Sequence, residues 1–231
     1  MLNFLRTMSI KNKIKTLSFF PLVFIIGMSF YIDMNLYNKQ SKLVDVKEII
    51  DLNERISLLL HETQKERGIT SVFLGTKGAK FKDTLITQKE LTNKNIEEFK
   101  KTINKISVEK YPENGKNLID NVLKELSSIQ NIRSDVDSLA IDAKKAIAYY
   151  TDLNATLLSF VALTSTIADS ESTIKSIIAY YNFLMAKERA GIERAVGSNT
   201  FASKTFASGM FVKYLGLVNE QKIFFDAFFM Y

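Results

Sequence analysis

The stretch that decides the fold is residues 43–60, LVDVKEIIDLNERISLLL, inside a longer run, residues 33–74, that holds no Pro and a single Gly. Apolar residues recur there at steps of three or four, at Leu43, Val46, Ile49 or Ile50, Ile56 and Leu60. This spacing places them on one face of an amphipathic helix. At about 1.5 Å per residue, a helix over residues 33–74 reaches about 60 Å.

The rest of the chain is also predicted to be helical. A turn is expected at residues 75–78, with Gly75 just past a helix end, and a loop at residues 111–115. The expected helices are 80–107, 117–132, 137–168, 173–196 and one from about 210, with a break at 169–172 capped by Ser170 and an irregular region at 197–208. No alternating strand pattern bounded by turns is visible, so the predicted fold class is all-α, a helical bundle. The sequence ends within the apolar helical pattern of residues 223–231, so we expect the domain to be truncated at its C-terminal end.

The N-terminal segment is predicted to cross a membrane. Residues 16–32 carry no charge, three lysines (Lys11, Lys13 and Lys15) precede them, and Asp33 follows. Seventeen residues is the short end of a spanning helix. The positive-inside rule places the basic flank 1–15 in the cytoplasm and residues 33–231 outside it, in the periplasm of a cell whose inner membrane the chain crosses once. A cleaved signal peptide is the alternative, but no small-x-small cleavage motif follows the apolar stretch.

Composition excludes several classes of function. The chain has no Cys and one His, which removes disulfides, thiolate metal sites, multi-histidine metal sites and most nucleophile–base pairs. Of the net charge of +6, four charges come from Arg6 and the three lysines before the apolar segment. No basic stripe with interleaved aromatic residues remains, so we expect no nucleic-acid partner. No phosphate loop, cofactor motif or catalytic constellation is visible, so no cofactor is expected and the chain is not predicted to be an enzyme.

Two charged segments inside apolar helical sequence are the best indication of function: residues 64–68, QKERG, and residues 186–195, AKERAGIERA. Arginine is rarely buried without a partner, and glycine within a helix costs about 1 kcal/mol relative to alanine. On an ideal helix Lys187, Gly191 and Arg194 share a face, and the glycine leaves a hollow between the two cations. A guanidinium suits flat oxyanions such as nitrate, nitrite and carboxylate.

The competing interpretation is that both segments are solvated helix faces with local ion pairs. Arg189 and Glu193, four residues apart, are able to pair in this way. Arg67 shares its face with small or hydrogen-bonding residues: Thr63, Gln64, Thr70 and Ser71. His61 could line a pocket one turn before the first segment, although a lone helical histidine is more often a packing or surface residue.

The two segments together resemble a known family. Residues 64–78 with Phe81 and Lys82, followed by residues 149–151, 186–195 and 201–202, are similar in order and spacing to the motifs of the NIT family, the nitrate- and nitrite-sensing domain. The resemblance covers about residues 45–231. It implies an all-helical extracytoplasmic sensor, here the N-terminal part of a bacterial methyl-accepting chemotaxis receptor or sensor kinase that acts as a homodimer.

The same resemblance implies arginines as ligands of nitrate or nitrite. Carried onto this chain, Arg67 and Arg194 are the first candidates, Arg189 and Lys65 come next, and Lys187 completes the set. The alternative function is a helical protein-interaction or dimerisation module without a small-molecule ligand. Surface-exposed Arg67 and Arg194 would favour that alternative.

Overall fold

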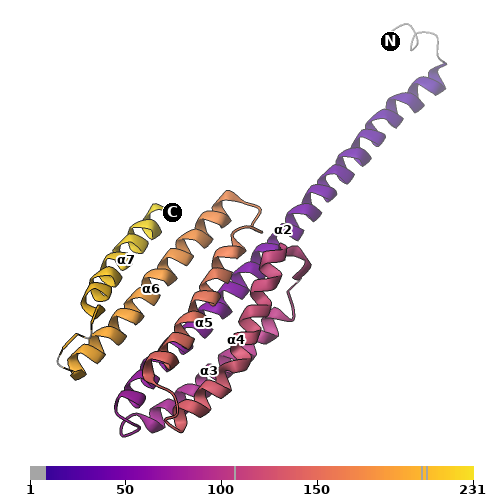
Figure 1. Cartoon of the computed structure of the whole chain (residues 1–231). Coiled ribbons are helices and arrows are strands. Elements are labelled where there is room, and N and C mark those ends of the chain that lie inside the picture. The colour runs from indigo at the N-terminus through magenta and orange to yellow at the C-terminus, as the bar shows by residue number, and fades with distance from the viewer. Residues whose placement is uncertain (1–8, 107, 204, 207) are drawn as a thin grey trace. The chain divides into compact units, whose positions relative to one another are not determined.

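The computed structural model describes residues 9–231 apart from residues 107, 204 and 207, and all regular structure in this part of the chain is helical (Figure 1). The elements are α2 (Ile10–Gly75), α3 (Lys82–Ile103), a 3-10 turn η1 (Val108–Lys110), α4 (Glu113–Asp137), α5 (Ala143–Thr164), α6 (Glu171–Ser203) and α7 (Met210–Met230). The predicted all-α class is confirmed. The chain divides into two units, Met1–Asp45 and Val46–Tyr231.

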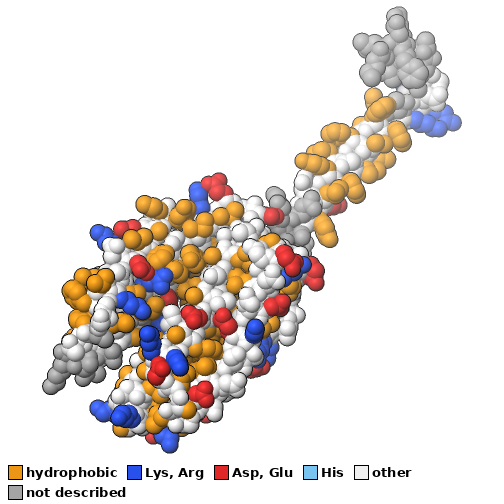
Figure 2. All heavy atoms as spheres, viewed as in Figure 1, with side chains coloured by type: hydrophobic (Ala, Val, Ile, Leu, Met, Phe, Trp, Pro, Cys, Tyr) orange, Lys and Arg blue, Asp and Glu red, His pale blue; other side chains and the backbone are white. Residues whose placement is uncertain are grey.

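The described part of the first unit is the N-terminal portion of α2. Its segment Ile10–Tyr37 is long and apolar enough to cross a membrane, with a mean hydropathy of 1.8. Its hydrophobic side chains are exposed, and Figure 2 shows them along the helix. Helix α5 passes the same test of length and composition, but 44% of its apolar window is buried, as in the core helix of a bundle. Arg6 of the predicted basic flank lies outside the described residues.

The second unit is a helical bundle with one main apolar core. Its fully buried side chains come from five helices: Leu52, Ile56, Leu59 and Leu60 of α2, Phe99 of α3, Val122 of α4, Leu153, Leu157 and Phe160 of α5, and Leu184 of α6. Helix α7 packs on α6, with the rings of Phe183 and Phe228 5.7 Å apart. Within this bundle, residues of α2 and α6 line a common cavity.

Helix α4 begins four residues before its predicted start at residue 117. Pro112 stands at the N-cap, where its missing N–H removes no helical hydrogen bond. Gly115, which made the segment look like a loop, is buried in the first turn. A Cβ at this position would lie 2.6 Å from Cδ2 of Leu163 in α5. A side chain here would displace Leu163 or Tyr111, so the close packing of the first turn favours the glycine, which lies inside the helix.

Other helix ends also differ from the prediction. Helix α5 begins at Ala143 and not at residue 137, because the Asp142 carboxylate caps it by accepting a hydrogen bond of 2.8 Å from the backbone N–H of Lys145. Helix α6 runs through Gly197 to Ser203, seven residues past its predicted end. Helix α3 ends at Ile103, and Ser107, its predicted last residue, lies outside the described residues.

Two predicted helix ends are confirmed. The hydroxyl of Ser170 accepts a hydrogen bond of 3.1 Å from the backbone N–H of Thr173, and α7 begins at Met210. At the turn after α2, Gly75 itself is still helical. The left-handed residues between α2 and α3 are Lys77, Gly78 and Phe81, with φ of 50°, 79° and 66°.

Candidate functional site

Arg67 of the first charged segment is buried and paired with Glu188 of the second. The side chains of Arg67 and Glu188 are 2% and 3% exposed. The two guanidinium nitrogens Nη1 and Nη2 lie 2.5 and 3.3 Å from Oε1 and Oε2 of Glu188. Nη1 also donates to the hydroxyl of Thr151 over 3.2 Å. The buried cation thus has a carboxylate partner from the protein itself, as burial of a charge requires.

The Glu188 carboxylate is satisfied on its other side by amides. Gln64 donates to Oε2 over 2.7 Å and Asn154 over 3.4 Å. Asn154 in turn accepts a hydrogen bond of 2.6 Å from Thr63. A polar network therefore joins α2, α5 and α6 within the core.

A second buried pair is formed by the residue next to Arg67. Glu66 accepts hydrogen bonds of 2.7 and 2.8 Å from Nε and Nη2 of Arg133 in α4, and one of 2.8 Å from the Tyr150 hydroxyl. Burial, and then the Glu66 charge, raise the pKa of the Tyr150 phenol well above its usual range. Adjacent residues of α2 are thus tied to α4 and to α6 by two separate ion pairs.

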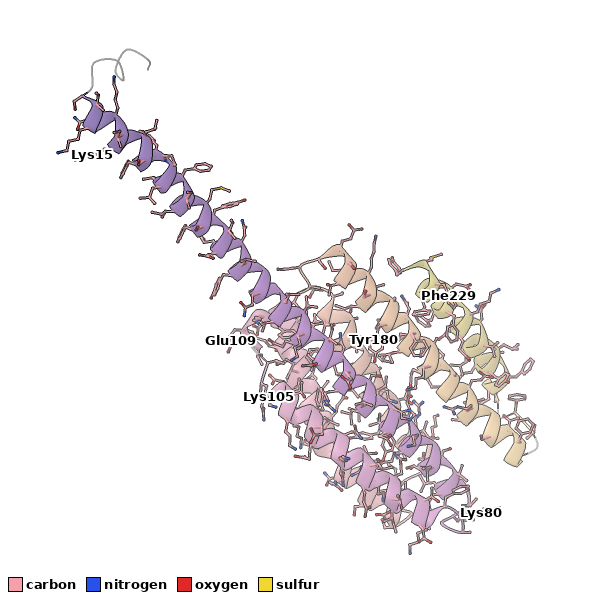
Figure 3. All side chains as sticks on the ribbon, turned by 180° about the vertical axis from the view of Figure 1, so that it is seen from behind. Lys15, Lys80, Lys105, Glu109, Tyr180 and Phe229 are labelled. Atoms are coloured by element: carbon pink, nitrogen blue, oxygen red, sulfur yellow. The ribbon has the colours of Figure 1, made fainter. Side chains whose placement is uncertain are left out.

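A cavity of about 320 Å³ lies between α2 and α6, beside the Arg67–Glu188 pair (Figure 3 shows both helices with their side chains). Its basic lining residues are His61 and Lys65 from α2 and Lys187 and Arg194 from α6. Uncharged polar lining comes from Gln64, Ser71 and Ser198. Among the described residues that line the cavity, none is acidic.

The predicted shared face of Lys187, Gly191 and Arg194 is confirmed, since all three line this cavity. Within the described part of the chain, no side-chain hydrogen bond or ion pair engages Lys187 or Arg194. Burial, and then the positive charge of Arg194, lower the pKa of the Lys187 ammonium. Two cations that repel each other across a cavity are stabilised by an anion between them.

Gly191 allows the buried pair to approach the cavity. A Cβ at residue 191 would lie 3.0 Å from Nη2 of Arg67, closer than ordinary van der Waals contact. The Arg67 guanidinium therefore lies directly behind the part of the cavity wall that Gly191 forms. Gly68, in contrast, has nothing within 4 Å of a Cβ and is not required by packing.

The structure divides the five predicted ligand residues into three groups. Lys65, Lys187 and Arg194 line the cavity, with Lys65 also 3.0 Å from Glu62. Arg67 does not line it, because its guanidinium is engaged by Glu188 behind the wall.

Arg189 lies on another face of α6. Its Nε is 2.6 Å from Glu220 of α7, and its guanidinium carbon is 5.8 Å from the centre of the Phe224 ring. The predicted pairing of Arg189 with Glu193 is absent among the described contacts, and Glu193 instead accepts a hydrogen bond of 2.6 Å from Gln221. Arg189 therefore joins α6 to α7 and does not reach the cavity.

Glu66, Glu188 and Arg133 were not among the predicted site residues, although the sequence carries a signal for buried charges. Buried residues of α2 follow steps of four and three at Leu59, Thr63, Glu66, Thr70 and Phe73. In α4 the same steps give Val122, Leu126, Ile129, Arg133 and Val136. A charged residue in phase with a buried stripe predicts a buried ion pair, although the pattern alone does not name its partner.

Known proteins resemble this chain in family and in fold. The family model described as nitrate and nitrite sensing (NIT) matches residues 58–231. The fold is similar to a solved structure described as the NasR transcription antiterminator, with a TM-score of 0.78 at 21% sequence identity. The alignment covers 87% of this chain and 55% of that one, so this chain spans about half the length of NasR, and the likeness shows the fold. A search among curated proteins found no match. Because the family model spans both charged segments and the cavity between them, the chain belongs to the NIT family of nitrate- and nitrite-sensing domains.

Proposed function

We propose that this domain binds nitrate or nitrite in the cavity between α2 and α6. The observation that carries the proposal is the lining itself: two cations without a partner in the described structure, Lys187 and Arg194, face a cavity with no acidic lining residue. Membership of a nitrate- and nitrite-sensing family supports a sensory role over a catalytic one. A small flat oxyanion accepts the directed hydrogen bonds of a guanidinium and removes the repulsion between the two cations.

The structure supports different roles for the predicted ligands. Arg194 and Lys187 contact the anion from α6, and Lys65 contributes from α2. Arg67 acts through Glu188 and Gly191, because it sets the shape and the spacing of the wall behind the anion. Arg189 takes no part in binding, since it is engaged with α7.

An anion bound in this cavity contacts both α2 and α6 and so links the two helices. The ligand draws cations of α6 and α2 together, and α2 is already tied to α4 and α6 through Glu66 and Arg67. A shift of α2 is then the signal. We further propose that residues 16–32, inside the apolar segment Ile10–Tyr37, anchor the chain in the inner membrane as a homodimer. Residues 33–231 then lie in the periplasm, and the shift passes along α2 into the membrane.

A second candidate, a protein-interaction module, is favoured by exposed apolar side chains of α7. Phe229 and Val212 are 80% and 73% exposed. Exposure of both Arg67 and Arg194 was expected for the interaction module. In the structure Arg67 is buried and Arg194 is exposed, so only one of the two meets that expectation. Arg67 is buried in its ion pair with Glu188, which excludes a solvated face but does not by itself indicate a ligand. The cavity cations Lys187 and Arg194 make the sensor the better supported function.

Calorimetric titration of the full chain in detergent micelles separates the two candidates. Nitrate, nitrite, chloride and acetate are added at constant ionic strength, and folding is checked by circular dichroism. We expect saturable heat with nitrate or nitrite at a dissociation constant between about 1 μM and about 1 mM, and none with chloride. No heat from any anion in folded protein overturns the sensor and leaves the interaction module.

A further inference from the structure

His61, the only histidine of the chain, lines the cavity without a role in the proposed set of ligands. The residue is exposed to solvent and stands at the open side of the cavity lining, where an anion can reach its imidazole. The charged groups that act on it come from both helices of the cavity: Glu62 and Lys65 from α2, and Lys187 and Arg194 from α6. Within the described residues, no other element contributes to the cavity wall.

The protein groups around His61 disfavour its charged form. Burial, and then the positive charge of Lys187, lower its pKa from the ordinary 6.5. Lys65 and Arg194 act in the same direction, and Glu62 alone acts against them. Near pH 7 the imidazole is therefore neutral, with one nitrogen that donates and one that accepts.

An anion in the cavity reverses this balance. Its negative charge offsets the field of the surrounding cations and favours the imidazolium. An imidazolium also has two donors and no acceptor, so neither nitrogen presents a lone pair to the ligand oxygens. Anion binding therefore favours protonation of the His61 imidazole.

We propose that His61 is a further ligand-binding residue of this cavity, and that anion binding is coupled to uptake of a proton by its imidazole. The inference rests on the proposed function, because it requires an anion in the same cavity. It makes the sensor responsive to acidity as well as to the anion.

The sign of the coupling follows from the direction of the change. Because the pKa of His61 is higher with the anion bound than without it, affinity is greatest below the free-state pKa. Affinity then falls as the pH rises to the bound-state pKa and is constant above it. The ratio of the two affinities equals ten raised to the difference between the two pKa values.

A single histidine makes the test direct. Untagged full chain in micelles, labelled with carbon-13 at the imidazole Cε1, is titrated by NMR from about pH 5 to about pH 8 in nitrate or in chloride at equal ionic strength. We expect saturating nitrate to raise the midpoint by about one pH unit, with about a tenfold loss of nitrate affinity across that window. The same midpoint in both salts overturns the inference.

Two variants identify the group that titrates. His61→Gln keeps a polar side chain without a titratable group, and its nitrate affinity should be nearly equal at both ends of the window. Lys187→Arg keeps the cation but cannot lose its proton in this range, and its affinity should still fall as the pH rises. A full pH dependence in His61→Gln assigns the coupling to another group and refutes the proposal.

Calorimetry on the same samples keeps this inference apart from the proposed function. Nitrate heat with an unchanged His61 midpoint removes proton coupling and leaves nitrate binding standing. No nitrate heat at any pH, in folded protein, removes the proposed function, and the inference is then wrong as well.

Discussion

Replacing Arg67 by Met should destabilise the bundle strongly, because it leaves the Glu188 carboxylate buried without a cation. Arg67 and Glu188 are both nearly fully buried, and two guanidinium–carboxylate contacts join them. Loss of one member of a buried pair typically costs about 3–5 kcal/mol. The hydrogen bonds from Gln64 and Asn154 remain to the carboxylate, which places the expected loss near about 3 kcal/mol.

Urea unfolding of the second unit's helices, followed by circular dichroism in the full chain, measures this loss. Lys65→Met is the matched control, since it removes an ion pair to Glu62 on the same helix at a partly exposed site. That control should cost less than about 1 kcal/mol. Adding Glu188→Gln to Arg67→Met should recover about 2 kcal/mol, because the uncompensated charge is then removed.

The outcome separates a buried structural arginine from a free ligand group. A loss below about 1 kcal/mol for Arg67→Met, equal to that of the control, would refute the buried pair. The same variant is then a poor test of binding, because lost stability and lost affinity are combined in it. Arg194, exposed and without a described partner, is the better position for that purpose.

Two further changes test local parts of the account. Gly68→Ala should raise the free energy of unfolding by about 0.5–1 kcal/mol in urea titrations, because a Cβ there meets nothing within 4 Å. Gly191→Ala should give no such gain and should weaken nitrate binding about tenfold in calorimetry, because its Cβ meets the buried Arg67 guanidinium at 3.0 Å. Equal gains in stability for both variants would contradict the close approach of Arg67 to Gly191. Asp142→Ala should lower stability by about 1 kcal/mol through loss of the α5 cap, and an unchanged urea midpoint would show that the cap contributes nothing.

Local periodicity predicted much of the fold. Apolar residues spaced three and four apart predicted the buried face of the bundle part of α2, and the predicted helix end at residue 74 is one residue from the observed end at Gly75. The predicted start of α7 near residue 210 is confirmed, whereas α3 is shorter at both described ends than the predicted 80–107. Helix ends were less predictable where a glycine has a tertiary role. Gly115 was predicted to lie in a loop, because its contact with Leu163 of α5 is not visible in the local sequence. The local sequence also does not show that α6 continues through Gly197.

The candidate site was predictable to the extent that it depends on one helix. The shared face of Lys187, Gly191 and Arg194 follows from helical geometry alone, and the cavity confirms it. The partners of Arg67 and Arg189 could not be deduced, because Glu188 and Glu220 lie far from them in sequence or on another helix. Which charges meet is decided by packing between helices, and a single helix pattern does not carry that information.

Nitrate titration of Arg194→Gln and of Arg189→Gln shows whether the anion binds at the guanidinium that lines the cavity. Both variants remove one guanidinium from α6, five residues apart, but only Arg194 lines the cavity. Loss of one charge-assisted contact costs about 1.5–3 kcal/mol, or roughly 10- to 150-fold in affinity. We expect this loss of nitrate affinity for Arg194→Gln, and an affinity close to that of the unchanged chain for Arg189→Gln. Full nitrate affinity in folded Arg194→Gln, or an equal loss in both variants, would contradict it.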